Sequence, residues 1–107
     1  MEAPFDVSDS DFDEQLLNHD LILVDFWAPW CGPCRMVGPV IRQLAKDYGG
    51  RVAFGKLNTD ENPKTSLRYR VMSIPTLILF KKGKSVEVTV GAAPRRNIEA
   101  MIQKHLT

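Results

Sequence analysis

The two cysteines of this chain, Cys31 and Cys34, are the residues whose type and spacing most directly indicate chemistry. They enclose a Gly-Pro pair in the stretch DFWAPWCGPC, and an acidic residue, Asp25, stands six positions before Cys31. A cysteine pair at this spacing can serve as half of a metal site, as a structural disulfide or as a reactive dithiol. Each of these sites makes a different demand on the rest of the chain.

A zinc site would need more ligands than the chain offers. Structural zinc takes four cysteine or histidine ligands, usually as two closely spaced pairs. The remaining candidates, His19 and His105, lie far apart in the sequence and form no pair. We therefore expect no bound metal.

A structural disulfide between Cys31 and Cys34 would stabilise the fold only weakly. Closing so short a ring removes about 2 kcal/mol of unfolded-state entropy, before any strain is subtracted. Small secreted proteins that depend on disulfides usually carry several, whereas this chain can form one. The spacing is therefore a poor way to gain stability.

Redox chemistry fits the local sequence best. The pair lies between a predicted strand and a predicted long helix, which places Cys31 at the helix N-terminus. Unsatisfied N–H groups and the helix dipole stabilise an anion there, so a larger fraction of Cys31 is the nucleophilic thiolate. Cys34 comes one turn later, where we expect less access to free N–H groups and to solvent. Cys31 is thus expected to attack a disulfide and Cys34 to resolve the mixed disulfide.

Short apolar runs alternate with amphipathic segments along the chain, which is typical of α/β folds. The run LILVDFWA at 21–28 is apolar on both faces apart from Asp25, and it predicts a central strand covered on both sides. The other expected elements are strands at 4–7 and 51–58, a hairpin at 76–90 that turns at Gly83, and helices at 8–17 after a Ser8 N-cap, at 33–48, at 62–71 and from Pro94 onward. The order β-α-β-α-β-α-β-β-α implies a mixed sheet with helices on both faces.

Length and charge exclude several classes of protein. A chain of 107 residues is expected to form one domain over 1–107. With 14 basic and 13 acidic residues the formal net charge is +1, so nothing favours nucleic acid or a membrane surface as a partner. The apolar runs are far shorter than the ~18–20 residues that span a bilayer. The first residues lack the basic and apolar regions of a secretory signal, so we expect a cytoplasmic protein.

Three stretches together identify a family. The chain carries VDFWA at 24–28, WCGPC at 30–34 and IPT at 74–76, and in these it resembles the thioredoxin family over essentially its whole length. The resemblance implies the thioredoxin fold, an α/β fold with a central five-stranded mixed sheet flanked by four helices. It also implies a general protein disulfide reductase that binds no cofactor and uses a redox-active Cys31–Cys34 disulfide. Its expected partners are disulfide-containing client proteins and a thioredoxin reductase, and we expect a monomer.

Asp25 and Lys56 are expected to support the dithiol. Periodicity places Asp25 where both faces of the strand are buried, and burial raises the pKa of a carboxyl group. The resemblance makes Asp25 the group that exchanges a proton with Cys34. Lys56 shares a strand face with Phe54, and the resemblance places it beside Asp25, where it would tune the pKa of that carboxyl.

The remaining expected site residues line a groove for client proteins. The resemblance makes the bond before Pro75 cis, which leaves the backbone of Ile74 free to hydrogen-bond to a client chain. Two departures from the family pattern stand out: Ser73 replaces a frequent glycine, and the stretch AAPRR at 92–96 lacks a capping residue for the last helix. The expected client-binding residues are Trp30, Gly32, Pro33, Thr59, Ser73, Ile74, Pro75 and Gly91.

Two other functions remain open on the sequence alone. An oxidase or isomerase of the same fold would differ in redox poise, although the Gly-Pro between the cysteines favours a reductase by analogy with the family. The chain could also act without catalysis, as a subunit or redox regulator of a larger assembly.

Overall fold

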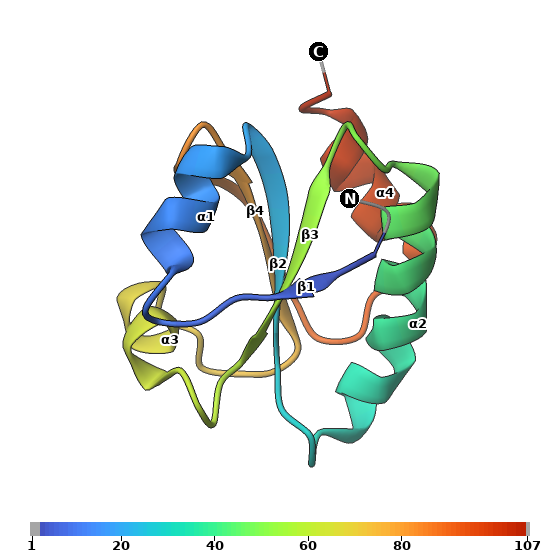
Figure 1. The fold of residues 1–107 in the computed structure, drawn as a ribbon. Coiled ribbons are helices and arrows are strands. Elements are labelled where there is room, and N and C mark those ends of the chain that lie inside the picture. The colour runs from blue at the N-terminus through green and yellow to red at the C-terminus, as the bar shows by residue number, and fades with distance from the viewer. Residues whose placement is uncertain (1–2, 107) are drawn as a thin grey trace.

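The computed structural model describes residues 3–106, and a mixed β-sheet forms its centre (Figure 1). The five strands of these residues are β1 Phe5–Asp6, β2 Leu21–Trp27, β3 Ala53–Asn58, β4 Thr76–Lys81 and β5 Lys84–Val90. Their order in the sheet is β1-β3-β2-β4-β5, with β1, β3 and β2 parallel and both β4 and β5 joined by antiparallel pairing. The expected fold class is confirmed, with β2 as the central strand.

Four helices cover the two faces of this sheet within residues 3–106. They are α1 Phe12–Asn18, α2 Gly32–Asp47, α3 Pro63–Arg68 and α4 Arg95–Gln103. Figure 1 shows α1 and α3 on one face and α2 and α4 on the other. None of the described helices is long and apolar enough to cross a membrane.

The alternation of side chains along β2 explains why this strand is apolar throughout. Leu21 and Leu23 pack in the core between the sheet and helices α2 and α4. Ile22, Val24 and Phe26 point to the opposite core, which α1 closes. Successive side chains of a strand point to opposite faces, so Asp25 follows Leu23 onto the α2 side. Asp25 is therefore an ionisable residue in a strand that is buried on both faces.

Helix α1 begins later than the sequence predicted. It starts at Phe12, with Asp11 as the N-cap, so the expected Ser8 cap is wrong. The N–H of Ser8 donates to the carboxylate of Asp11 at 2.7 Å, and the Ser8 hydroxyl donates to the same oxygen at 3.0 Å. Asp11 therefore closes a turn that precedes the helix instead of forming its first turn.

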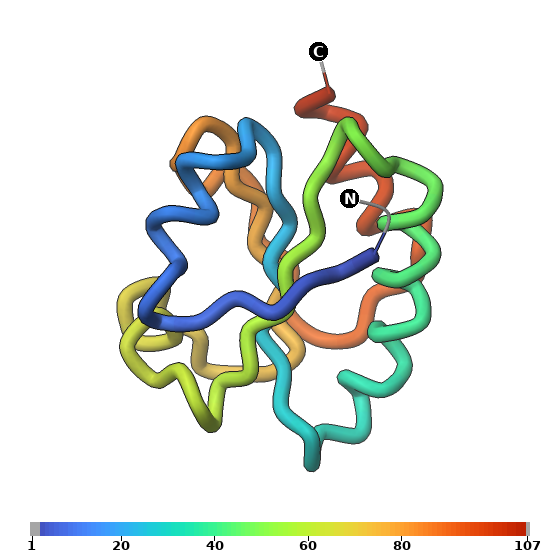
Figure 2. The backbone as a smooth tube through the Cα atoms, in the orientation of Figure 1, coloured from blue at the N-terminus to red at the C-terminus, as the bar shows by residue number. Residues whose placement is uncertain are grey.

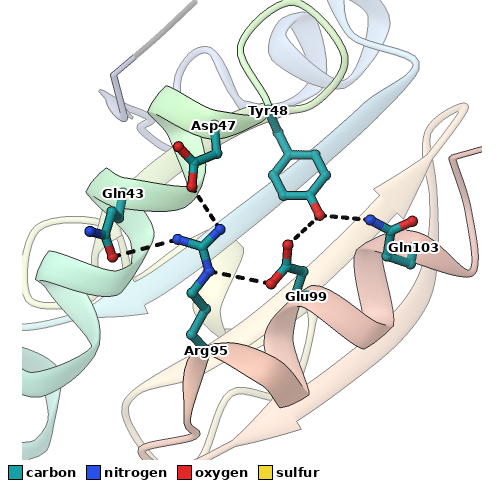
Figure 3. A network of polar contacts seen from close by, with 6 residues as sticks. All are labelled: Gln43, Asp47, Tyr48, Arg95, Glu99 and Gln103. Carbon is teal, nitrogen blue, oxygen red and sulfur yellow. Dashed lines mark hydrogen bonds and ion pairs between the residues drawn. The ribbon is translucent and has the colours of Figure 1, made fainter.

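Helix α4 is held at its N-terminus by an arginine instead of a cap. Pro94 is the N-cap and makes no side-chain cap bond, as the stretch 92–96 suggested. The guanidinium of Arg95, however, contacts the carboxylates of Asp47 at 2.7 Å and Glu99 at 3.3 Å. Figure 3 shows the whole network between α4 and the end of α2, formed by Gln43, Asp47, Tyr48, Arg95, Glu99 and Gln103.

The two ends of the molecule differ in what they carry. The backbone trace shows the turn between β2 and α2 projecting at one end (Figure 2). The turn between β4 and β5 and the end of α4 lie at the opposite end (Figure 2). The cysteine pair thus lies where the carboxyl end of β2 meets the first turn of α2.

Candidate active site

Cys31 and Cys34 are joined in a disulfide at the start of α2, with their Cα atoms 5.3 Å apart. Cys31 is the N-cap of α2, and its sulfur accepts a hydrogen bond from the backbone N–H of Cys34 at 3.2 Å. Pro33 stands in the first turn, where its missing N–H costs no helical hydrogen bond. In the reduced protein the same N–H and the helix N-terminus would favour the thiolate of Cys31.

Solvent access does not distinguish the two cysteines. Cys31 is 3% exposed and Cys34 is 6% exposed, so the expected greater exposure of Cys31 is wrong for the disulfide form. The two cysteines differ instead in hydrogen bonding, because the sulfur of Cys31 accepts the backbone N–H of Cys34. The expected order of attack therefore rests on electrostatics at the helix N-terminus, not on exposure.

Asp25 is buried behind the dithiol. It is 2% exposed, and burial raises its pKa from 3.8 to about 7 although the positive charge of Lys56 lowers it. Its Oδ1 atom has no hydrogen-bond partner among the described residues. Asp25 and Cys34 both line one cavity of about 420 Å³. The rest of its lining is Trp27, Ala28, Pro29, Arg35, Gly38, Pro39, Arg42 and Lys56.

Lys56 lies beside Asp25, as expected. The two residues are register partners in the parallel pair formed by β2 and β3, and both line the cavity. The ammonium nitrogen of Lys56 lies 4.4 Å from the centre of the Trp27 ring. A cation over an indole face is attracted by the ring quadrupole, so Trp27 helps to hold the Lys56 side chain in place.

The segment around Pro75 packs against Cys31. The peptide bond between Ile74 and Pro75 is cis, which confirms the expectation. The carbonyl oxygen of Ile74 lies 3.7 Å from the sulfur of Cys31. The N–H of Gly91 donates to the carbonyl of Pro75 at 2.8 Å. Ile74, Pro75 and Gly91, which are distant from the cysteines in the sequence, thus lie together on one side of Cys31.

The other predicted groove residues surround the same end of the sheet. Trp30 is 68% exposed, and Gly32, Pro33 and Ser73 are exposed as well. Thr59 has a structural contact, because its N–H and hydroxyl donate to the carbonyl of Trp27 at 2.8 and 3.2 Å. It secures the ends of β2 and β3 against each other.

Sequence reasoning missed Asp60 and two arginines. The indole N–H of Trp30 donates to the carboxylate of Asp60, with distances of 3.0 and 3.2 Å to its oxygens. The strand order could have indicated this contact. Trp30 follows β2 and Asp60 follows the parallel strand β3, so both residues lie at the carboxyl ends of neighbouring strands. Arg35 and Arg42 line the cavity of Asp25, and no motif indicated them. Residues 3–106 contain no group of three or more metal-ligating side chains that could hold an ion.

Comparison with known proteins agrees with this geometry. A family model described as Thioredoxin matches residues 3–104. Thioredoxin 1 of Nostoc sp. is 49% identical over 107 residues, covering 99% of this chain and 100% of the relative. A thioredoxin of Synechocystis sp. is 50% identical over the same shares. A chloroplastic thioredoxin of Arabidopsis thaliana is 48% identical, and the match covers 99% of this chain and 55% of that protein.

A solved structure shows the same arrangement. A mutant thioredoxin from Halobacterium salinarum superposes with a TM-score of 0.92 at 34% sequence identity. The match covers 99% of this chain and 93% of that one. The likeness therefore extends over the whole sheet and its helices.

Proposed function

The chain belongs to the thioredoxin family and is a protein-disulfide reductase, and on that premise we propose the roles of the residues around its dithiol. Members of the family are thiol–disulfide oxidoreductases that act on disulfide-containing client proteins and are recharged by reductase partners. The redox group is the Cys31–Cys34 pair itself, and no cofactor takes part.

In the proposed first step, the Cys31 thiolate attacks one sulfur of a client disulfide. A bond forms between Cys31 and that sulfur, the client S–S bond breaks, and the second client sulfur leaves as a thiolate that takes up a proton. Support for Cys31 as the attacking residue is the N–H of Cys34, which points at its sulfur from 3.2 Å. A thiolate at that position would be stabilised by this hydrogen bond and by the N-terminus of α2.

In the proposed second step, Cys34 loses its proton and attacks the sulfur of Cys31. The Cys31–Cys34 bond forms, the mixed disulfide breaks, and the remaining client sulfur leaves as a thiolate. Two electrons have then passed from the dithiol to the client. A reductase partner restores the dithiol by supplying two electrons and two protons.

Asp25 is the proposed acceptor of the Cys34 proton. The observation that carries this role is that Asp25 and Cys34 line the same cavity of about 420 Å³. Because burial raises the pKa of Asp25 to about 7, both its protonated and its ionised forms are available near neutral pH. The cavity is large enough for water to bridge the two groups. Lys56 is the proposed positioning residue that keeps this pKa from rising further.

The client chain is proposed to lie across the segments that meet beside Cys31. The backbone of Ile74, held by the cis bond to Pro75, would pair with an extended client segment. Trp30 would contribute an exposed apolar surface on one side and Gly91 a close approach on the other. The further proposed members of this surface are Gly32, Pro33, Thr59 and Ser73.

We also propose that the chain works as a monomeric single domain in the cytoplasm, with a thioredoxin reductase as its electron donor. The presence of one cysteine pair supports this location, since small secreted proteins usually carry several disulfides. The alternative location is the chloroplast, because the longer relative from Arabidopsis thaliana is named as chloroplastic. Cell fractionation with an antibody to the chain distinguishes the two locations.

Trapping of the mixed disulfide tests the order of attack. We expect Cys34→Ser to accumulate a covalent adduct with a disulfide-bonded protein and Cys31→Ser to form none, whereas the wild type reduces that protein with dithiothreitol as donor. The reverse pattern of adducts would overturn the assignment of the two cysteines. Equilibration of the wild type with a glutathione redox buffer then separates a reductase, which is largely a disulfide at equilibrium, from an oxidant, which is largely a dithiol.

The pH dependence of single-turnover reduction tests Asp25. We expect Asp25→Asn to slow the second step and to lose the inflection near pH 7, because the titrating acceptor is gone and only the ionisation of Cys34 itself still depends on pH. A variant with the same rate and the same pH profile as the wild type would remove Asp25 from the mechanism.

A further inference from the structure

Strand β5 presents apolar side chains at the free edge of the sheet. It is the last strand in the order β1-β3-β2-β4-β5 and pairs with β4 on one side only. Three of its valines are exposed: Val86 is 37%, Val88 55% and Val90 63% accessible. Val88 is the register partner of Ile78 and Val90 that of Thr76, so both lie on the face that α1 and α3 cover elsewhere.

The two halves of β5 are protected differently. Edge strands are usually kept from pairing with other chains by charged residues, prolines or bulges. The first half of β5 has such protection, since Lys84 begins it and the pairing with β4 is irregular between Leu79 and Phe80. The half from Val88 to Val90 carries no charged residue and pairs regularly with β4. It can therefore accept another strand.

This half of β5 continues directly into the surface beside the dithiol. Cys31 contacts the carbonyl of Ile74, and the carbonyl of the next residue, Pro75, accepts the N–H of Gly91 at the end of β5. Extended chain advances about 3.3 Å per residue, and neighbouring strands are about 4.8 Å apart. A client segment joined to Cys31 through its own cysteine thus reaches Val90 within about three to five residues.

Energetics decide which partner this edge can bind. A few cross-strand side-chain pairs contribute far less than two free molecules lose in translational and rotational freedom. A second copy of this chain, or any free partner, would therefore bind the edge too weakly to matter. A client held by the mixed disulfide has already lost that freedom, and its effective concentration at the edge is in the millimolar range of short tethers, about 1 mM or more.

We propose that the exposed edge of β5 at Val88 and Val90 binds, as an added β-strand, the client segment that lies about three to six residues from its reactive cysteine, once the client is tethered to Cys31. The preferred client segment is extended and rich in β-branched apolar residues, because these pack against the valines and pair with the free edge. The inference rests on the proposed function, in which Cys31 forms the mixed disulfide.

Matched peptide disulfides test the proposal. One peptide carries alternating valine and threonine three to six residues from its cysteine, and the other has proline at two of these positions, which removes N–H donors and prevents strand pairing. In Cys34→Ser, which holds the mixed disulfide, we expect the equilibrium constant for forming that disulfide to be about three- to tenfold higher for the strand-forming peptide. Val88→Ser and Val88→Glu should reduce this ratio toward one, whereas Leu17→Ser, a matched change at an exposed position of α1, should leave it unchanged.

Reduction of a small disulfide without a peptide distinguishes a failure of the proposed function from a failure of the proposal for β5. If the wild type fails to reduce it, the proposed function fails. If all variants reduce it equally, they are folded and active, and any change in the peptide ratio reports on β5. Equal equilibrium constants for both peptides in Cys34→Ser, or an equal loss for both when Val88→Glu is added to it, would overturn the proposal for β5.

A trapped complex gives a direct structural readout. In a mixed disulfide of Cys34→Ser with the strand-forming peptide, we expect amide hydrogen exchange between Val88 and Val90 to slow at least about tenfold, because the edge N–H groups gain partners. The proline-containing peptide should leave these rates unchanged. Equal exchange rates in both complexes would show that the edge stays free and would overturn the proposal.

Discussion

Lys56 lies directly beside Asp25 across the parallel strands β3 and β2, and both side chains line the cavity behind Cys34. Burial raises the pKa of Asp25 to about 7, and the charge of Lys56 opposes this rise. The pKa of Asp25 should therefore affect both the free energy of unfolding and the transfer of the Cys34 proton.

The stability of the protein should fall as the pH rises toward and above neutrality. An acid with a raised pKa in the folded state binds more protons than in the unfolded state, so the free energy of unfolding decreases from about pH 4 to above pH 7. The full effect of ionising Asp25 is on the order of 4 kcal/mol. Asp25→Asn has no such carboxyl, so we expect it to exceed the wild type in stability at pH 8.

Urea unfolding of the disulfide form at several pH values measures this difference. Glu14→Gln, a change at an exposed acid of α1, is the control and should follow the wild type. A constant difference between Asp25→Asn and the wild type across this pH range would contradict the linkage.

Replacing Lys56 should move the pH dependence of the second step. Lys56→Met removes the charge that lowers the pKa of Asp25, so the midpoint of the rate against pH should shift to more alkaline values. Single-turnover reduction of a mixed disulfide between pH 6 and 9 gives this midpoint. Lys46→Met, at an exposed position of α2, should leave it in place. An unchanged midpoint in Lys56→Met would remove Lys56 as a positioning residue.

Asp9 should stabilise α3 from a distant part of the chain. Its carboxylate accepts the backbone N–H groups of Lys64 at 3.0 Å and Thr65 at 2.8 Å, whereas the N-cap Asn62 makes no side-chain cap bond. Asp9→Ala should therefore lower the free energy of unfolding by about 1 kcal/mol at pH 7, the usual value of a cap. Asp9→Asn, which keeps an acceptor oxygen, should lose less.

The contribution of Asp9 should disappear in acid. Burial acts to raise its pKa, but hydrogen bonds from Thr65 and Lys64 outweigh burial and hold the pKa below 3.8. A depressed pKa stabilises the folded state above the unfolded pKa, and this stabilisation is lost as the pH falls through the folded value. Urea titrations of wild type and Asp9→Ala should therefore converge at low pH. A gap that persists there would point to packing instead of capping.

Gly55 should tolerate no side chain. A Cβ at this position would lie 2.7 Å from a methyl carbon of the buried Val7, which packs over β3. We expect Gly55→Ala to cost about 1–3 kcal/mol by overpacking, against a smaller gain of about 0.4–1 kcal/mol from the stiffer unfolded chain. A double-mutant cycle with Val7→Ala tests the contact. Additive losses in the double variant would show that Val7 is not the cause.

Local patterns in the sequence predicted the fold and the centre of the site well. The both-faces apolar run at 21–28 identified β2, and the spacing of Cys31 and Cys34 at a strand-to-helix junction placed them at the start of α2. Alternation along β3 put Lys56 on the face of Phe54, and the resemblance to the thioredoxin family placed it beside Asp25, which is its register partner in the structure. These features depend on a period of two or 3.6 residues, which is visible in a short window of sequence.

Only the tertiary structure shows which distant segments contact one another, because the periodicity within a segment says nothing about its neighbours. The cap of α3 by Asp9, the hydrogen bond from Trp30 to Asp60 and the anchoring of α4 by Arg95 all join residues far apart in the chain. The start of α1 was decided by a short-range contact, because the carboxylate of Asp11 accepts the N–H of Ser8 three residues earlier. The sequence by itself therefore determined the sheet, its helices and the dithiol, because burial of alternating faces is a property of each segment alone. The burial of both cysteines and the free edge of β5 emerge only when the sheet order assigns each segment its neighbours.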